Sequence, residues 1–178
     1  MKRAMVFVSV ALLAGIVFGQ EAKEQPKPPL AVRIVPAANG DAQARSIDLS
    51  QDKAHFDVVL TNVSDKPVRL WKEWCSWGYF CLSFEVQDGT GKLTAVRKTP
   101  RGWDKNFPSF QTLQPGSNMV FEVNFGSDWE NPVLPEKGKS IQVKMRAVYE
   151  IPPDDEAKKA EVWTGKVASP EEAYVIRR

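Results

Sequence analysis

Two cysteines, Cys75 and Cys81, are the residues whose type and spacing first suggest chemistry. They lie in the segment WKEWCSWGYFC, residues 71–81, which also holds three tryptophans, one tyrosine and one phenylalanine. Five residues separate the cysteines, whereas a redox CxxC motif has two between them. The segment reads as two strands joined by a turn, and exported proteins usually pair their cysteines. We therefore expect a Cys75–Cys81 disulfide across that turn and no redox chemistry.

Other catalytic or metal-binding residue sets are sparse. His55 is the only histidine, and it sits in an alternating strand-like run, on the face opposite Phe56 and Val58. The chain has no GxSxG elbow for a nucleophilic serine and no Gly-rich phosphate loop between a strand and a helix. One histidine and two paired cysteines are too few for a closed zinc site. The sequence predicts no catalytic residue, no metal and no cofactor.

Acidic residues beside tryptophans leave one enzymatic alternative open. Asp128 and Glu130 flank Trp129, and Asp104 follows Trp103. Two carboxylates hydrolyse glycosidic bonds when they lie about 5–10 Å apart in a cleft. The chain is short for such a cleft, so a small hydrolase is the least favoured function.

The six tryptophans are the strongest remaining indication of function. Exposed aromatic rings stack on sugars or anchor protein interfaces, whereas buried rings fill cores. Strand alternation from Leu70 points Trp74 inward and Trp71 outward. We expect Trp74 and Trp163 in the core, and Trp77 and Trp103 at the surface. The candidate binding surface consists of Trp71, Trp77, Tyr79, Arg101, Trp103 and Phe107.

The elements that must position these residues are strands. From Leu30 onward, apolar residues occur at every second position, which is the pattern of strands with one buried face. The clearest run is 141–151. The predicted inward residues are Val32, Ile34, Phe56, Val58, Leu60, Val68, Leu70, Phe80, Leu82, Phe84, Val86, Met119, Phe121, Val123, Phe125, Ile141, Val143, Met145, Ala147, Tyr149 and Ile151, with two short closing strands at 163–167 and 173–177.

Short turns separate the predicted strands. Residues 62–67 and 88–91 read as turns, and Gln114-Pro-Gly116 has the order of a type II turn. Residues 153–161 fit either one or two helical turns or a charged loop. Strands joined by short turns predict an all-β fold, a single antiparallel immunoglobulin-like β-sandwich of about seven to nine strands over residues 30–178.

The N-terminal residues 1–19 show the pattern of a secretory signal peptide. A basic MKR precedes fifteen apolar residues, and cleavage is expected before Gln20. Residues 20–29 are polar and Pro-rich, which predicts a flexible linker. The sequence therefore predicts a periplasmic or extracellular protein with no membrane contact after cleavage.

The charge of the expected mature chain is balanced. The full sequence has 24 basic and 22 acidic residues. Lys2 and Arg3 leave with the signal peptide, which leaves 22 of each sign. Nucleic-acid binding lacks its electrostatic driving force in such a chain, so no nucleic-acid partner is expected.

Three segments of the chain resemble a known family. They are Asn62-Val-Ser-Asp-Lys-Pro-Val-Arg-Leu70, Phe84-Glu-Val-Gln-Asp-Gly-Thr-Gly-Lys92 and Leu113-Gln-Pro-Gly116. Together they resemble bacterial immunoglobulin-like sandwiches, most of all the intracellular proteinase inhibitor (BsuPI) family, over roughly residues 54–123. The resemblance implies the sandwich fold and proteinase inhibition. This chain differs in its export signal, its cysteine pair and a Trp-bearing insert at 99–110, and no residues match an inhibitory loop.

These observations predict an exported, non-enzymatic binding module, monomeric, that acts through protein–protein interaction at a sheet edge or through the loops of Trp77 and Trp103. Proteinase inhibition is one form of that function. The alternative is a carbohydrate-binding module that holds a cell-envelope polysaccharide with exposed tryptophans. Two or more coplanar exposed rings would favour the sugar; an apolar patch or an unprotected edge strand would favour a protein.

Overall fold

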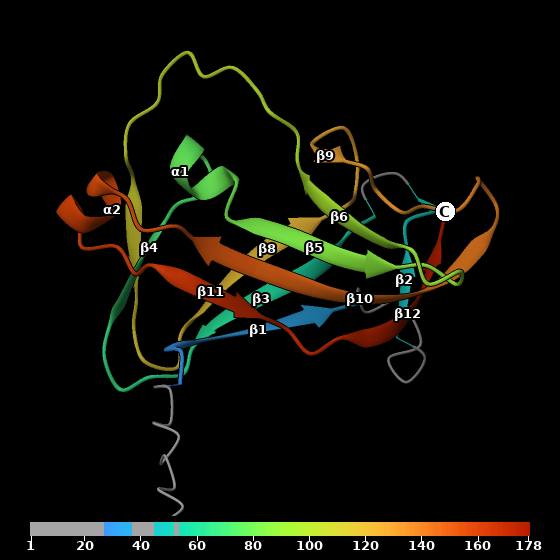
Figure 1. Cartoon of the computed structure of the whole chain (residues 1–178), viewed down its shortest axis with the longest axis horizontal. Helices are drawn as coiled ribbons and strands as arrows, with labels where there is room; N and C mark the ends of the chain where they lie inside the picture. Colours follow the sequence, from blue (N-terminus) through green and yellow to red (C-terminus); the bar gives the residue numbers. More distant parts are fainter. Residues whose placement is uncertain (1–26, 37–44, 52–53) are drawn as a thin grey trace, which may run out of the picture.

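Figure 1 shows the computed structural model of the chain, which describes residues 27–36, 45–51 and 54–178. The predicted signal peptide, residues 1–19, and most of the predicted linker, residues 20–29, lie outside these ranges. Within them, no helix has both the length and the apolar character needed to cross a membrane. Strands dominate the described chain, so the predicted all-β class is confirmed.

The described residues form twelve strands and two short helices, so the predicted count of seven to nine strands was too low. The strands are β1 (Leu30–Val35), β2 (Ser46–Asp48), β3 (Phe56–Asn62), β4 (Val68–Trp71), β5 (Leu82–Gln87), β6 (Leu93–Lys98), β7 (Phe110–Leu113), β8 (Asn118–Val123), β9 (Trp129–Glu130), β10 (Ser140–Ile151), β11 (Gly165–Ala168) and β12 (Glu172–Arg177); the helices are α1 (Ser76–Tyr79) and α2 (Asp155–Lys159). Strands as short as β2 and β9 are too brief to show an alternating pattern.

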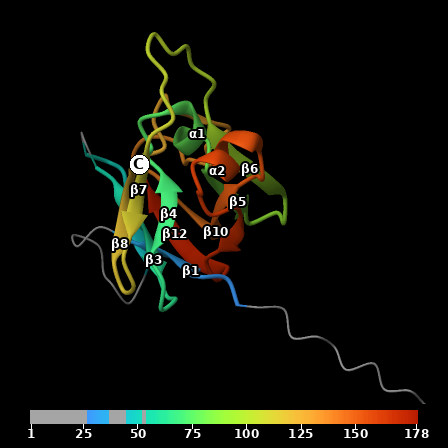
Figure 2. The same ribbon diagram turned by 90° about the vertical axis from the view of Figure 1, so that its left-hand side faces the viewer.

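The strands pair in three groups. The largest sheet has the order β2-β12-β10-β5-β6-β9, with β11 beside the second half of β10. A smaller antiparallel sheet has the order β1-β3-β8, and β4 pairs with β7 in a two-stranded ribbon. β12 and β2 are parallel, and all other pairs are antiparallel. In Figures 1 and 2, the β1-β3-β8 sheet lies against one face of the large sheet.

The core lies between these two sheets. Phe56 of β3 and Phe84 of β5 meet edge to face, with ring centroids 5.7 Å apart, and Phe121 of β8 contacts Tyr149 of β10 at 5.8 Å. All four side chains are buried. The alternation that predicted these residues as inward-facing is thus confirmed for β3, β5, β8 and β10.

A buried asparagine fixes the turn between β3 and β4. The side-chain nitrogen of Asn62 donates to the carbonyls of Lys66 at 2.7 Å and Leu113 at 2.8 Å. Its side-chain oxygen accepts from the backbone N–H and the hydroxyl of Ser64. An Asn side chain commonly takes this role in turns because it can replace backbone partners. Asn62 therefore ties the small sheet to the β4–β7 ribbon.

The remaining turns follow their sequence signals. Gly116 has a φ of +75°, and Ser117 N–H donates to the Gln114 carbonyl, as the type II turn predicted there requires. Residues 153–161 contain α2, capped by the Asp154 carboxylate, which accepts from the Ala157 N–H at 2.6 Å. The helical alternative for this segment is therefore confirmed.

Candidate functional site

The segment 71–81 differs from the predicted strand–turn–strand arrangement. β4 ends at Trp71, and residues 76–79 form the helical turn α1 before β5 begins at Leu82. Gly78 allows this close packing, because a Cβ atom there would overlap the main-chain carbonyl of Lys72. Phe80, predicted to face inward with β5, instead follows α1 and is exposed.

This helical turn changes the relation between the two cysteines. Cys75 and Cys81 are both buried and both free, so the structure does not contain the predicted disulfide. Each thiol donates to a backbone carbonyl: Cys75 Sγ to Lys72 at 3.1 Å and Cys81 Sγ to Trp77 at 2.9 Å. The cross-strand geometry that favoured a bond is absent, because a helical turn separates the residues.

The electrostatics around the Cys81 thiol oppose nucleophilic chemistry. Burial, with a smaller contribution from Cys75, raises the pKa of the Cys81 thiol to about 12. The phenol of Tyr149 lies beside Cys81, and burial raises its pKa well above the usual value as well. A thiol becomes a nucleophile only as the thiolate. Cys81 is therefore a structural thiol at neutral pH.

Two residues of the predicted binding surface lie in the interior. Trp71 and Tyr79 are almost fully buried, so their placement at a surface was wrong. Trp71 packs against Trp77, with ring centroids 6.0 Å apart, and Trp77 is half-buried against the core. Trp163 also packs against the core, as predicted. The helical turn α1 directs Tyr79 inward, a change that strand alternation could not reveal.

The insert that follows β6 is held against α1. The Arg101 guanidinium lies 4.2 Å from the Tyr79 ring and 4.3 Å from the Trp103 ring, and these two rings meet edge to face at 5.6 Å. At the other end, Asn106 accepts from the Ser76 N–H at 3.0 Å. The insert thus uses Arg101 and Trp103 for its own packing.

Phe107 is the most exposed aromatic of the insert, with 69% of its surface accessible. Trp103 is half-buried beneath Arg101. Of the predicted surface residues, the structure therefore brings Tyr79, Arg101 and Trp103 together, leaves Phe107 apart, and places Trp71 with Trp77.

A buried lysine supports the same region. Lys98 Nζ lies 5.0 Å from the Tyr79 ring centroid, 4.5 Å from that of Trp129 and 3.2 Å from Glu73 Oε1. Cation–π contact and the carboxylate together compensate for the loss of water around the ammonium group. Sequence patterns gave no signal for this site, because its four side chains come from three separate segments, with Glu73 and Tyr79 in residues 71–81.

Trp74 is the exposed tryptophan that strand alternation missed. It was predicted to lie in the core, but 59% of its surface is accessible. The alternation stops because β4 ends at Trp71 and the chain turns, with the Cys75 N–H donating to the Lys72 carbonyl. The Lys72 ammonium lies 5.9 Å from the Trp74 ring centroid.

Trp74 lies at a groove between the β4–β7 ribbon and β8. The groove has a volume of about 390 Å³ and is lined by Lys72, Glu73, Trp74, Gln111, Asn118, Met119 and Val120. Val120, at 53% exposure, adds a second apolar side chain. β8 pairs with β3 on one side, and no strand of the described chain pairs with its other side. We call this the Trp74 groove.

The carboxylates of the hydrolase alternative lie in open positions. Asp104, Asp128 and Glu130 are all exposed. Catalytic acids are usually buried enough to shift their pKa, so this arrangement offers the hydrolase hypothesis no support. Among the described residues, no three His, Cys, Asp or Glu side chains cluster as metal ligands would.

The fold and this site define an all-β protein with an exposed tryptophan at a strand edge. Comparison of the chain with models of known protein families and with curated proteins finds no match.

Proposed function

We propose that this protein is an exported, non-enzymatic module that binds another protein through the Trp74 groove. The observation that carries the proposal is the exposure of the Trp74 ring at 59%, beside the free edge of β8. Tryptophan is among the residues most enriched at the energetic centres of protein interfaces. An indole left open in this way stabilises a complex when a partner covers it.

The surroundings of Trp74 match the composition of such interfaces. Val120 extends the apolar surface, and polar side chains from Lys72, Gln111 and Asn118 surround it. Interfaces combine an apolar centre with a polar rim in this way. Truncation of a central tryptophan typically weakens binding by about 2–4 kcal/mol, which corresponds to roughly 30-fold to 1,000-fold.

Carbohydrate binding is the weaker alternative. A sugar platform needs exposed rings that lie in one plane. The two most exposed rings of the described residues, Trp74 and Phe107, take part in none of the aromatic pairs. A single exposed ring without a coplanar neighbour suits a protein interface better than a sugar platform.

We further propose an immunoglobulin-like origin for the fold and a relation to the intracellular proteinase inhibitor (BsuPI) family. Two packed antiparallel sheets and the turns at 62–67, 88–91 and 114–116 support this relation. Proteinase inhibition is then one form of the proposed protein binding. As the sequence predicts, we also propose that the protein is exported, is a monomer and uses no cofactor.

The test is capture of partners from cell-envelope extract by the immobilised chain 20–178, with Trp74→Ala and Phe107→Ala as a matched pair of exposed-aromatic variants. We expect Trp74→Ala to lose the captured proteins and Phe107→Ala to retain them, with both variants folded. Unchanged capture by Trp74→Ala would contradict the proposal. Binding to a glycan array that Trp74→Ala abolishes would favour the carbohydrate alternative.

A further inference from the structure

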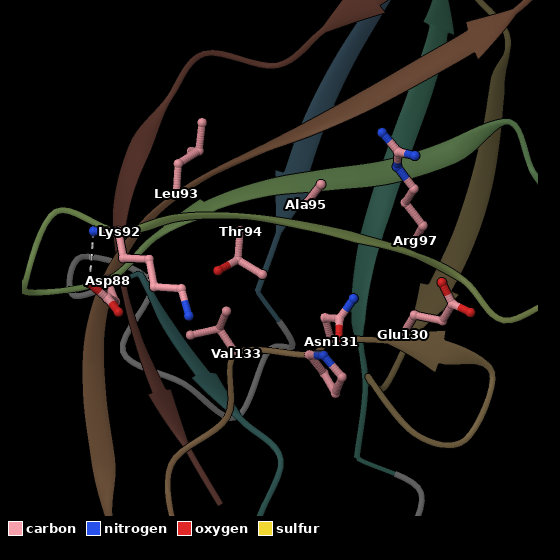
Figure 3. A pocket seen from close by; sticks show the side chains of 10 residues that line it. Asp88, Lys92, Leu93, Thr94, Ala95, Arg97, Glu130, Asn131 and Val133 are labelled. Atoms are coloured by element: carbon pink, nitrogen blue, oxygen red, sulfur yellow. Dashed lines mark hydrogen bonds between the residues drawn. The ribbon is translucent and has the colours of Figure 1, made fainter.

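A second groove runs along β6, on the opposite side of that strand from β5. Figure 3 shows β6 with the segment 130–133 facing it across the groove. The volume is about 720 Å³, and the lining residues used below are Leu93, Ala95, Arg97, Glu130, Pro132 and Val133. None of these residues belongs to the Trp74 groove, so the site is independent of the one proposed above.

The backbone of β6 turns hydrogen-bonding groups toward this groove. Thr99 N–H donates to the Asp128 carbonyl at 2.9 Å, and Arg97 lies opposite Glu130 in the β6–β9 pair. The N–H and C=O groups of Thr99 and Arg97 therefore point toward β9. Antiparallel strands alternate these groups with a period of two residues. Ala95 and Leu93 therefore direct their N–H and C=O groups to the same side as Arg97. The opposite side of β6 pairs with β5.

Those four backbone groups have no hydrogen-bond partner among the described residues, because β9 stops short. β9 pairs only with Arg97 and Lys98. After Glu130 the chain bends away, since Asn131 adopts a φ of +52° and Pro132 has no N–H to donate. The sheet thus opens where β6 and the segment 130–133 separate, and two N–H and two C=O groups are left facing the groove.

We propose that this groove binds an extended peptide segment of another protein, which adds to the large sheet as a strand beside residues 93–96 of β6. Main-chain hydrogen bonds to an exposed sheet edge are a recurrent mode of peptide recognition. Here Leu93 and Ala95 offer four such bonds to a strand of matching register.

The shape of the groove favours a single extended strand over a second copy of this chain. In Figure 3, the segment 130–133 stands opposite the free edge of β6, so an approaching folded sheet meets that segment before it reaches β6. An added strand needs about 4.8 Å beside β6, and the groove of about 720 Å³ lies on that side of the strand.

The side chains indicate the chemistry of the peptide. Leu93 is 62% exposed and lies on the same face as Ala95, while Thr94 faces the other way. Val133 and Pro132 add apolar surface from the opposite wall. The positive charges of Lys92 and Arg97 are balanced by Asp88 and Glu130. The best ligand is therefore an uncharged segment with apolar or β-branched residues at alternate positions.

The test uses a phage-displayed library of random ten-residue peptides, selected on the immobilised chain 20–178. Ala95→Pro removes one groove-facing N–H and leaves the β5–β6 pairing intact, because Pro is tolerated where the N–H points away from the sheet. Ala95→Ser keeps the N–H and is the matched control. We expect selected peptides to bind the wild type and Ala95→Ser equally, and Ala95→Pro about tenfold more weakly.

A second measurement does not depend on any protein variant. Selected peptides are synthesised with N-methyl groups on either alternate set of amides. Methylation of the set that faces β6 should weaken binding to the wild type by about tenfold or more, and methylation of the other set by much less. Equal losses from the two sets would overturn strand addition.

Three other results would also overturn the proposal. The first is that no selected peptide binds Ala95→Pro more weakly than the wild type. The second is that Trp74→Ala abolishes the binding of the selected peptides. The third is that the protein forms a concentration-dependent dimer, which Ala95→Pro disrupts. The second would locate the peptides in the Trp74 groove, and the third would make a second copy the occupant. Loss of the Trp74 interaction alone would leave the β6 proposal standing.

Discussion

Replacement of Asn62 by Ala should destabilise the protein by about 3 kcal/mol. The variant loses four hydrogen bonds, while the Leu113 carbonyl keeps the backbone N–H of Val68, its partner across the β4–β7 ribbon. Each of the four lost bonds contributes about 0.5–1 kcal/mol, with the bond to the buried Leu113 carbonyl at the upper end of that range. For a domain of this size, the melting temperature should fall by about 6–12 °C.

Two further variants separate this network from a general packing effect. Ser64→Ala removes one hydroxyl donor and should cost less than about 1 kcal/mol. Asn62→Asp places a carboxylate against the carbonyls of Lys66 and Leu113 and should be at least as damaging as Asn62→Ala at neutral pH. Its stability should recover partly as the pH falls, because the introduced carboxylate has a raised pKa and its protonated form can donate.

Urea denaturation of the four proteins, at pH 7 and pH 4, measures these differences. An Asn62→Ala variant within about 1 kcal/mol of wild type would show that water replaces the side chain without penalty and that these hydrogen bonds do not stabilise the fold. An Asn62→Asp variant with no pH response would show that the carbonyls do not face the substituted group.

Three other predictions concern the region around α1. Glu73→Ala should destabilise the protein by about 1–3 kcal/mol in urea denaturation, because it leaves the Lys98 ammonium buried without its carboxylate. Lys98→Met removes the charge itself and should cost about 1 kcal/mol or less. Equal losses of stability in the two variants would argue against an ion pair that compensates the buried charge. Gly78→Ala should cost about 1–3 kcal/mol in the same assay, because its methyl group overlaps a main-chain carbonyl, and a neutral result would exclude this packing. Cys81 should react with a thiol reagent at pH 8 roughly a thousandfold more slowly than in urea, because its pKa is about 12 against an ordinary value of 9.0; rapid labelling of the native protein would contradict its burial.

The raised pKa of Cys81 also sets the sign of its pH effect on stability. The folded state favours the protonated thiol, so the contribution of Cys81 is fully present below its unfolded pKa and is lost as the pH rises toward 12. Alkaline conditions above about pH 9 should therefore weaken the fold.

The strands were predictable where one face meets the core over several residues. The alternation in 141–151 corresponds to β10, and the alternation in 56–62 corresponds to β3. β6 gave a weak signal because Leu93 and Ala95 are exposed at a sheet edge. The same exposure makes that edge a candidate binding site.

The candidate site was harder to predict than the fold. Strand alternation assigned Trp74 to the core because it assumed that β4 continued past Trp71. A four-residue helical turn follows instead, and it reverses the placement of Trp74 and Tyr79 and separates the cysteines. Gly78 is the residue that permits this turn, but a single glycine also fits the β-turn that was predicted there.

The most direct test of the central proposal is the affinity of a purified captured partner for the wild type and for Trp74→Ala, measured by titration with Phe107→Ala as the control. We expect a loss of about 30-fold or more for Trp74→Ala and less than threefold for Phe107→Ala. A loss of less than threefold for Trp74→Ala, with the variant folded, would contradict the assignment of the Trp74 groove as the protein-binding surface.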